Sequence, residues 1–279
     1  MTAPEIGPLS LGEILDRMFF IYKRNFFVLV LTYGIPVILM IPLLILTIAG
    51  FSFSVIAPPS DRSVEATFLL FFFLVLFICV GTVLGWLATT SAVWEIQMGG
   101  KPTIRSSYAK AWKRLGTGLV SFFLGVMAFF MGYLLLIVPG ILIGLAISLT
   151  APTLTVEKLG PVASMERSWA LSKGYRWRIF VTALICYAMT AAMGYAVMIP
   201  AMVVLPATIA SGGTIPVWLF VVFGVAYALA VILPAPLLAI ALCLIYYDSR
   251  VRKEGFDLQR MIDTLAPPPS VSPQAPIAG

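Results

Sequence analysis

The fold of this protein is decided by residues 179–247, which read IFVTALICYAMTAAMGYAVMIPAMVVLPATIASGGTIPVWLFVVFGVAYALAVILPAPLLAIALCLIYY. These 69 consecutive residues contain no Asp, Glu, Lys or Arg. Three further charge-free stretches precede them, at 25–60, 66–94 and 115–156. The whole chain is 61% hydrophobic, against about 45–50% in soluble domains. This pattern predicts an all-α integral membrane protein.

The number of spans follows from stretch length and from the basic residues between the stretches. A transmembrane helix needs about 20 apolar residues, so the stretches 115–156 and 179–247 should each hold two helices. The turns between these helices are expected at Pro139-Gly140 in the first stretch and at residues 211–213 in the second. With one span each in 25–60 and 66–94, 17 of the 18 basic residues fall on one side, and only Arg62 falls on the other. The positive-inside rule assigns that side to the cytoplasm. We therefore expect six helices and two cytoplasmic termini, with helices at about 26–50, 67–93, 117–138, 140–156, 179–200 and 217–246.

The domain organisation is expected to be simple. Residues 1–263 form a single membrane domain, whose longest external connection is residues 51–66. Residues 264–279 are rich in Pro, Ser and Ala and are predicted to be a disordered tail. The beginning of the chain lacks the pattern of a cleaved signal peptide, so the first span is expected to be retained. The small-residue pairs Gly81/Gly85 and Gly140/Gly144 predict close helix packing.

A weak threefold repeat is visible in the segments that precede three of the spans. Each segment has helical apolar spacing and is predicted to be an amphipathic helix in the cytoplasmic headgroup layer. The first begins with a capping-box pattern, Ser10 with Glu13. Aligned without gaps, the segments place Arg17, Lys110 and Arg167 together. The predicted repeat units are about 10–98, 103–159 and 161–255; the alternative is that any helix entering a bilayer favours aromatic and basic residues at its edge.

The sequence offers little chemistry. It contains no histidine, and it shows no phosphate-binding loop, nucleophile elbow or cluster of metal ligands. We therefore predict no catalytic, cofactor-binding or metal-binding residues, and no enzyme activity. Pumps and ion-coupled carriers usually place charges within the membrane, and the apolar stretches here contain none, which argues against ion-coupled transport.

Two groups of charged residues are the candidate sites. The first is a cytoplasmic ring of ion pairs between acids at the ends of the repeat units and basic residues of the short helices. Its members are Arg17, Lys110, Arg167, Glu95, Glu157 and Asp248. The ring is either purely structural or acts as a gate. The second is a set of cations that either bind lipid phosphates or merely set the topology: Lys23, Arg24, Lys113, Arg114, Lys173, Arg176 and Arg178.

Three stretches together resemble a known family. They are PLSLGEILDR at 8–17, SWALSKG at 168–174 and YYDSRVRKEGFD at 246–257. They are similar to the glycerophosphoryl diester phosphodiesterase membrane domain family of six-helix bacterial inner-membrane proteins, over roughly residues 8–262. In some relatives this domain is fused to a catalytic barrel that uses histidine. This sequence has neither the barrel nor a histidine, so the resemblance implies the membrane fold without the phosphodiesterase activity.

The expected function is a non-enzymatic one at the bacterial inner membrane. The protein would bind or organise lipids, anionic ones in particular, or scaffold a protein partner through its basic cytoplasmic face. Binding of nucleic acid is not expected. The alternatives are a transporter or permease-like protein for an apolar or lipid-like solute and, third, a membrane enzyme that acts on lipid headgroups.

Overall fold

The computed structural model describes residues 9–56, 61–210 and 217–255, and these residues form eleven α-helices and no strand. Six stretches of helix are long and apolar enough to cross a membrane. The predicted all-helical, six-span architecture is therefore confirmed at this level. The predicted tail at 264–279 and the predicted turn at 211–213 lie outside the described residues.

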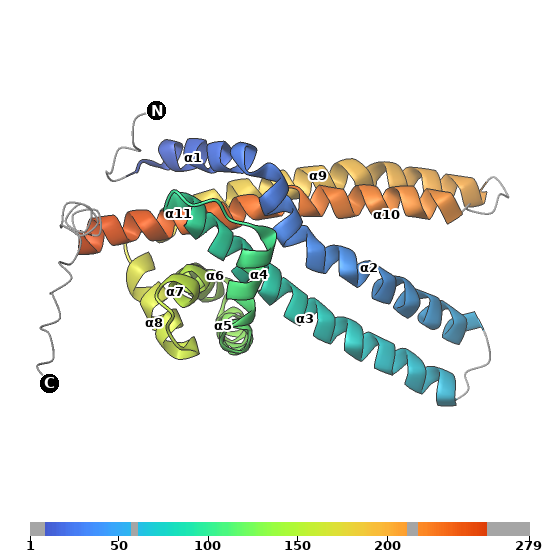
Figure 1. Ribbon diagram of the computed structural model, residues 1–279. Helices are drawn as coiled ribbons and strands as arrows, with labels where there is room; N and C mark the ends of the chain where they lie inside the picture. Colours follow the sequence, from blue (N-terminus) through green and yellow to red (C-terminus); the bar gives the residue numbers. More distant parts are fainter. Residues whose placement is uncertain (1–8, 57–60, 211–216, 256–279) are drawn as a thin grey trace, which may run out of the picture.

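The apolar helices form three consecutive hairpins. The first pairs α2 (Phe26–Ile56) with α3 (Asp61–Gln97). The second pairs α5 (Leu115–Leu135) with α6 (Ile137–Ile147), which α7 (Thr150–Val156) follows. The third pairs α9 (Arg176–Ala210) with α10 (Val217–Ile232), which α11 (Ala235–Glu254) follows. Figure 1 shows the α2–α3 and α9–α10 hairpins diverging from a common base, while α5 is seen nearly end-on below that base.

Each hairpin is preceded by a short helix, and the three short helices are built alike. They are α1 (Leu11–Arg24), α4 (Ile104–Trp112) and α8 (Pro161–Ser172), with N-caps at Ser10, Thr103 and Gly160. The residues four positions after each N-cap are fully buried: Ile14, Ser107 and Ser164. The residues eight positions after it are fully buried too: Met18, Ala111 and Ser168. One face of each short helix therefore packs on the base of the hairpins.

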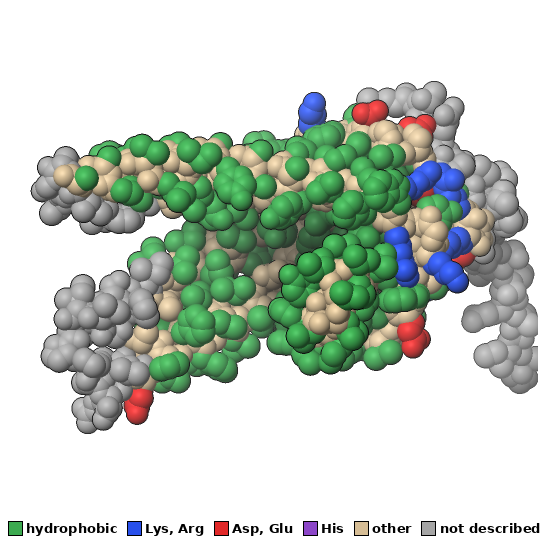
Figure 2. Space-filling view, turned by 180° about the vertical axis from the view of Figure 1, so that it is seen from behind, with side chains coloured by type: hydrophobic (Ala, Val, Ile, Leu, Met, Phe, Trp, Pro, Cys, Tyr) green, Lys and Arg blue, Asp and Glu red, His purple; other side chains and the backbone are tan. Residues whose placement is uncertain are grey.

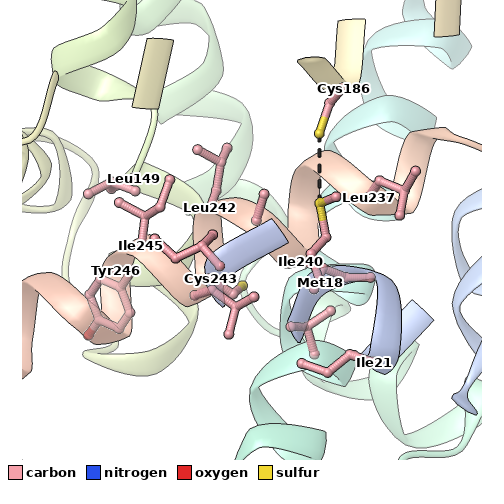
Figure 3. Packing of buried hydrophobic residues seen from close by; sticks show 14 of the residues in the cluster. Met18, Ile21, Leu149, Cys186, Leu237, Ile240, Leu242, Cys243, Ile245 and Tyr246 are labelled. Carbon is pink, nitrogen blue, oxygen red and sulfur yellow. Dashed lines mark hydrogen bonds between the residues drawn. The ribbon is translucent and has the colours of Figure 1, made fainter. Parts of the chain in front are cut away.

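Helix α11 is the centre of the core. In the most apolar part of the span that contains it, 67% of the residues are buried, against 11–39% in the other five spans. Figure 3 shows the contacts: Ile240 and Leu237 of α11 lie beside Met18 and Ile21 of α1, and the Cys186 thiol of α9 lies 3.8 Å from the sulfur of Met18. The cysteines labelled there pack as small apolar residues.

The spans differ from their predicted limits in two ways. Helices α2, α3 and α9 continue past the expected ends, to Ile56, back to Asp61 and to Ala210, so most of the predicted external connection 51–66 is helical. Conversely, two expected single helices are interrupted, between α6 and α7 at Ser148-Leu149 and between α10 and α11 at Leu233-Pro234. The turn of the second hairpin also falls at Leu136, three residues before the predicted Pro139-Gly140.

Hydroxyl groups of the short helices satisfy backbone groups where spans are interrupted. Pro36 has no N–H, which leaves the carbonyl of Thr32 without its helical donor, and the Tyr108 hydroxyl of α4 donates to that carbonyl at 2.6 Å. The Tyr22 hydroxyl of α1 donates to the carbonyl of Leu233, between α10 and α11, at 2.6 Å. Burial raises the pKa of Tyr108 to about 12, so this phenol remains a donor at neutral pH.

The break between α6 and α7 is closed in the same way. The Ser168 hydroxyl of α8 donates to the carbonyl of Ala146 at 2.7 Å and accepts from the N–H of Leu149 at 3.0 Å. A buried backbone group without a partner costs about 1–3 kcal/mol. These contacts fix each short helix against a hairpin.

Candidate functional site at the base of the hairpins

The expected ion-pair ring forms in part. Lys110 of α4 pairs with Glu95 at the end of α3, and Arg167 of α8 binds Glu157 with an Nε–Oε2 distance of 2.9 Å. Asp248 departs from the expectation, because Arg178 and Arg252 bind it in place of Arg17, Lys110 or Arg167. Arg252 was not predicted from the sequence, although its i,i+4 spacing from Asp248 is a signal from which this pair could have been predicted.

Asp248 anchors the residue that leads into α1. Its carboxylate is buried and accepts from the backbone N–H of Leu9 at 2.8 Å and from Arg252 Nε at 3.0 Å. The carbonyl of Leu9 in turn accepts from Arg178 at 2.9 Å and from Arg252 at 2.8 Å. One carboxylate and two guanidinium groups therefore hold the start of α1 against α9 and α11.

Glu157 belongs to a second network. It accepts from the Tyr246 hydroxyl at 2.8 Å and from Arg167, which also pairs with Glu254. Partial burial disfavours the charged form of Arg167, but hydrogen bonds to Glu157 and Glu254 outweigh it and raise the pKa of Arg167. Arg250 completes the network by binding Glu254 at 3.0 Å. These contacts join α7, α8 and α11.

A lysine that the sequence did not single out fixes the end of α8. The ammonium group of Lys253 donates to the carbonyls of Ala170, Leu171 and Lys173 at 2.7, 3.1 and 2.8 Å. Carbonyls at a helix C-terminus lack intrahelical donors and carry partial negative charge, so a cation there satisfies both needs.

The candidate lipid-contacting cations fall into two groups. Four are exposed: Lys23, Arg24, Lys113 and Lys173. The other three make contacts within the protein: Arg114 donates to the carbonyl of Lys158 at 3.1 Å, Arg176 lies 4.7 Å from the centre of the Trp169 ring, and Arg178 binds Asp248 and Leu9. Arg178 is therefore primarily a structural residue, and the exposed four remain candidates for lipid phosphates.

No family model, curated protein or solved structure matches this chain. The site is therefore judged by its own geometry. Within the ranges described, no three His, Cys, Asp or Glu residues lie close enough together to hold a metal ion. Glu157 and Glu254 share Arg167, and Arg250 also pairs with Glu254.

A cavity that sequence reasoning missed lies beside the charged base. It has a volume of about 420 Å³ and is lined by residues of α3, α5, α6, α7 and α8. Most of its wall is apolar, including Val83, Leu87, Phe122, Val126 and Phe129. Ser121 also lines it, and the Ser121 hydroxyl is buried with no hydrogen-bond partner among the described residues. Phe130, which is 58% exposed, marks where the cavity reaches the surface.

Proposed function

We propose that this protein is a non-enzymatic, multi-pass protein of the bacterial inner membrane that binds or organises lipid through a basic cytoplasmic face, with both termini in the cytoplasm. The observation that carries the proposal is the segregation of charge. On the face drawn in Figure 2, most of the visible Lys and Arg side chains gather around the base of the hairpins, while the hairpins that extend from it are covered by apolar side chains.

The apolar surface suits contact with acyl chains. In five of the six spans at most 39% of the most apolar segment is buried within the protein, so most of their side chains are at least partly exposed. Such a surface is stable only against lipid or against other apolar helices. Cations at the base would then lie at the level of the headgroups, where each contributes about 1 kcal/mol near an anionic surface. Alternatively, the same basic face would bind a protein partner.

The three short helices are proposed to lie in the cytoplasmic headgroup layer as equivalent parts of three repeat units. In each of them the residues four and eight positions after the N-cap are fully buried, which supports this arrangement. So do two tryptophans on their outer faces, Trp112 at 65% and Trp169 at 45% exposed, because tryptophan favours the membrane interface. Phe19, aligned with them in sequence, packs against the core instead, so the repeat would be approximate.

Transport of an apolar or lipid-like solute is the second candidate, and the interrupted spans favour it. Transporters use broken helices to offer backbone groups to their substrates. Here, however, Ser168 closes the break between α6 and α7, and Tyr22 binds a carbonyl at the break between α10 and α11. Because those groups already have protein partners, lipid binding is the better supported of the two functions.

We further propose membership of the glycerophosphoryl diester phosphodiesterase membrane domain family, on the three sequence stretches named above. All three meet in the structure: Leu9 of the first contacts Asp248 of the third, and Lys253 of the third donates to the carbonyls of Ala170, Leu171 and Lys173 of the second. These contacts give a physical reason for the stretches to occur together.

The test of lipid binding is a comparison of lipids retained by purified variants. Lys113→Gln with Lys173→Gln removes two exposed cations, and Lys101→Gln removes an exposed cation that is not a candidate. Each variant is reconstituted in nanodiscs of equal phosphatidylglycerol and phosphatidylethanolamine, extracted, and analysed by native mass spectrometry. We expect the preference for the anionic lipid to fall about fivefold per candidate cation and to be unchanged in the control. Equal retention in all variants would contradict the proposal.

A further inference from the structure

Three buried hydroxyl groups occupy equivalent places in the three hairpins. Thr32, Ser121 and Thr182 each lie six residues after the first residue of α2, α5 and α9. All three side chains are at least nine-tenths buried, and none of the three hydroxyls has a hydrogen-bond partner within the described ranges. Because the three hydroxyls are equivalent in position, the residues around them can be compared directly between the hairpins.

The middle hairpin has smaller residues around its hydroxyl. The residue three positions earlier is Leu29 in α2 and Ile179 in α9, but Gly118 in α5. The residue four positions later is a proline in α2 and a cysteine in α9, but Gly125 in α5. Leu29 and Ile179 are fully buried, so these larger side chains fill core space in the outer hairpins.

The two glycines have different effects. A Cβ at Gly118 would lie 2.7 Å from Leu87 Cδ1, so this glycine brings α5 close to α3 and closes one side of the cavity. A Cβ added at Gly125 would meet Ile147 Cδ1 at 3.3 Å, the end of a flexible side chain. Ser121 lies between them and lines this cavity, whose lining residues do not include Thr32 or Thr182.

We propose that this cavity binds one acyl chain of a membrane phospholipid, and that Ser121 donates a hydrogen bond to its ester carbonyl. The inference rests on the proposed lipid-binding function and assigns it a site. The cavity volume of about 420 Å³ falls in the range of small-molecule sites, about 300–1,000 Å³. Water is disfavoured in a cavity with so apolar a wall, whereas a hydrocarbon chain matches it.

The position of the cavity relative to the cations also fits a phospholipid. Arg114 is the N-cap of α5 and lies seven residues before Ser121, close to two turns away on the same face. At about 1.5 Å per residue this separation is about 10 Å along the helix. A lipid whose carbonyl meets Ser121 therefore has its phosphate on the side of Arg114 and Lys113. The chain enters where Phe130 is exposed and can exchange with the bilayer.

The experiment fills the cavity and measures lipid contact directly. Val126 lines the cavity, and its neighbour Met127 is 65% exposed and does not line it, so Val126→Trp and Met127→Trp form a matched pair. The full chain in nanodiscs is photolabelled with phosphatidylglycerol that carries a diazirine in one acyl chain, and labelled peptides are identified by mass spectrometry. Label is expected on the inner face of α5 and on α3 around Val83 and Leu87.

The expected outcomes separate the site from the general function. Val126→Trp should lower labelling of these inner positions about tenfold, Met127→Trp should leave it unchanged, and Ser121→Ala should weaken it about two- to tenfold through loss of one hydrogen bond. Equal labelling in both tryptophan variants overturns the cavity site, even if the anionic preference still depends on Lys113 and Lys173. Labelling by a diazirine fatty acid but not by the phospholipid overturns the choice of occupant.

Discussion

Replacing Asp248 by asparagine should destabilise the protein far more than the same kind of change at Glu95, although both acids were expected to belong to the same ring of ion pairs. The Asp248 side chain is 2% exposed and faces two guanidinium groups, whereas Glu95 is 27% exposed and its partner Lys110 is 54% exposed. Removing one partner of a buried ion pair costs about 3–5 kcal/mol. Because Arg178 and Arg252 are themselves 32% and 26% exposed, water partly screens them, and we expect about 2–4 kcal/mol for Asp248→Asn.

Glu95→Gln breaks a pair at the surface and should cost about 0–1 kcal/mol. The assay is unfolding of the detergent-solubilised protein by titration with sodium dodecyl sulfate, followed by near-ultraviolet circular dichroism. A local measurement adds specificity: amide exchange at Leu9 should accelerate in Asp248→Asn and stay slow in Glu95→Gln. Equal losses of stability in the two variants, or unchanged exchange at Leu9, would refute the anchoring role of Asp248.

Three further predictions concern the short helices and the middle hairpin. Tyr108→Phe leaves a buried carbonyl without a donor and should lower the free energy of unfolding by about 1–3 kcal/mol, whereas Tyr187→Phe, at a 73% exposed position, should leave it unchanged in the same titration. Gly140→Ala would place a Cβ 2.9 Å from a backbone nitrogen and should lower the midpoint of thermal unfolding, whereas Gly116→Ala, with nothing within 4 Å, should not. The N-cap hydrogen bonds lower the pKa of Glu13, so its contribution to α1 is complete above the ordinary carboxyl pKa and is lost as pH falls through the lowered value. The protection of backbone amides from exchange in the first turn of α1 should fall over this pH range in the wild type. In Glu13→Gln this protection should not depend on pH.

The number of spans could be predicted from the sequence because a charge in the bilayer is costly, so segments that cross it contain no charged residues. The sequence predicted their ends less well for a physical reason. Pro36 removes a backbone N–H inside α2, yet the helix continues for 20 residues beyond it, to Ile56, and Tyr108 supplies the missing donor from 76 residues away. No local pattern contains that information.

The charged base was partly predictable and the cavity was not. Pairs between neighbouring segments, such as Glu95 with Lys110, follow from the order of the units along the chain. The close packing expected at Gly140 is confirmed by its contact with the backbone of Tyr133. The cavity depends on the combined shape of five helices, and its signal in the sequence, Gly118 and Gly125 beside Ser121, acquires meaning only when α5 is compared with α2 and α9 in space.

The tyrosines that satisfy the interrupted helices also constrain the order of assembly during synthesis. The hydrogen bond to the Thr32 carbonyl can form only after Tyr108 has been translated. The hydrogen bond from Tyr22 can form only after Leu233, 211 residues later, has been translated. The first hairpin can therefore insert early but completes its bond only after α4 has been made, and α1 completes its own only after the last hairpin arrives. A ribosome-stalled or truncated chain that ends before α10 would retain both α1 and the first hairpin in the membrane in an unfinished state, open to proteolysis.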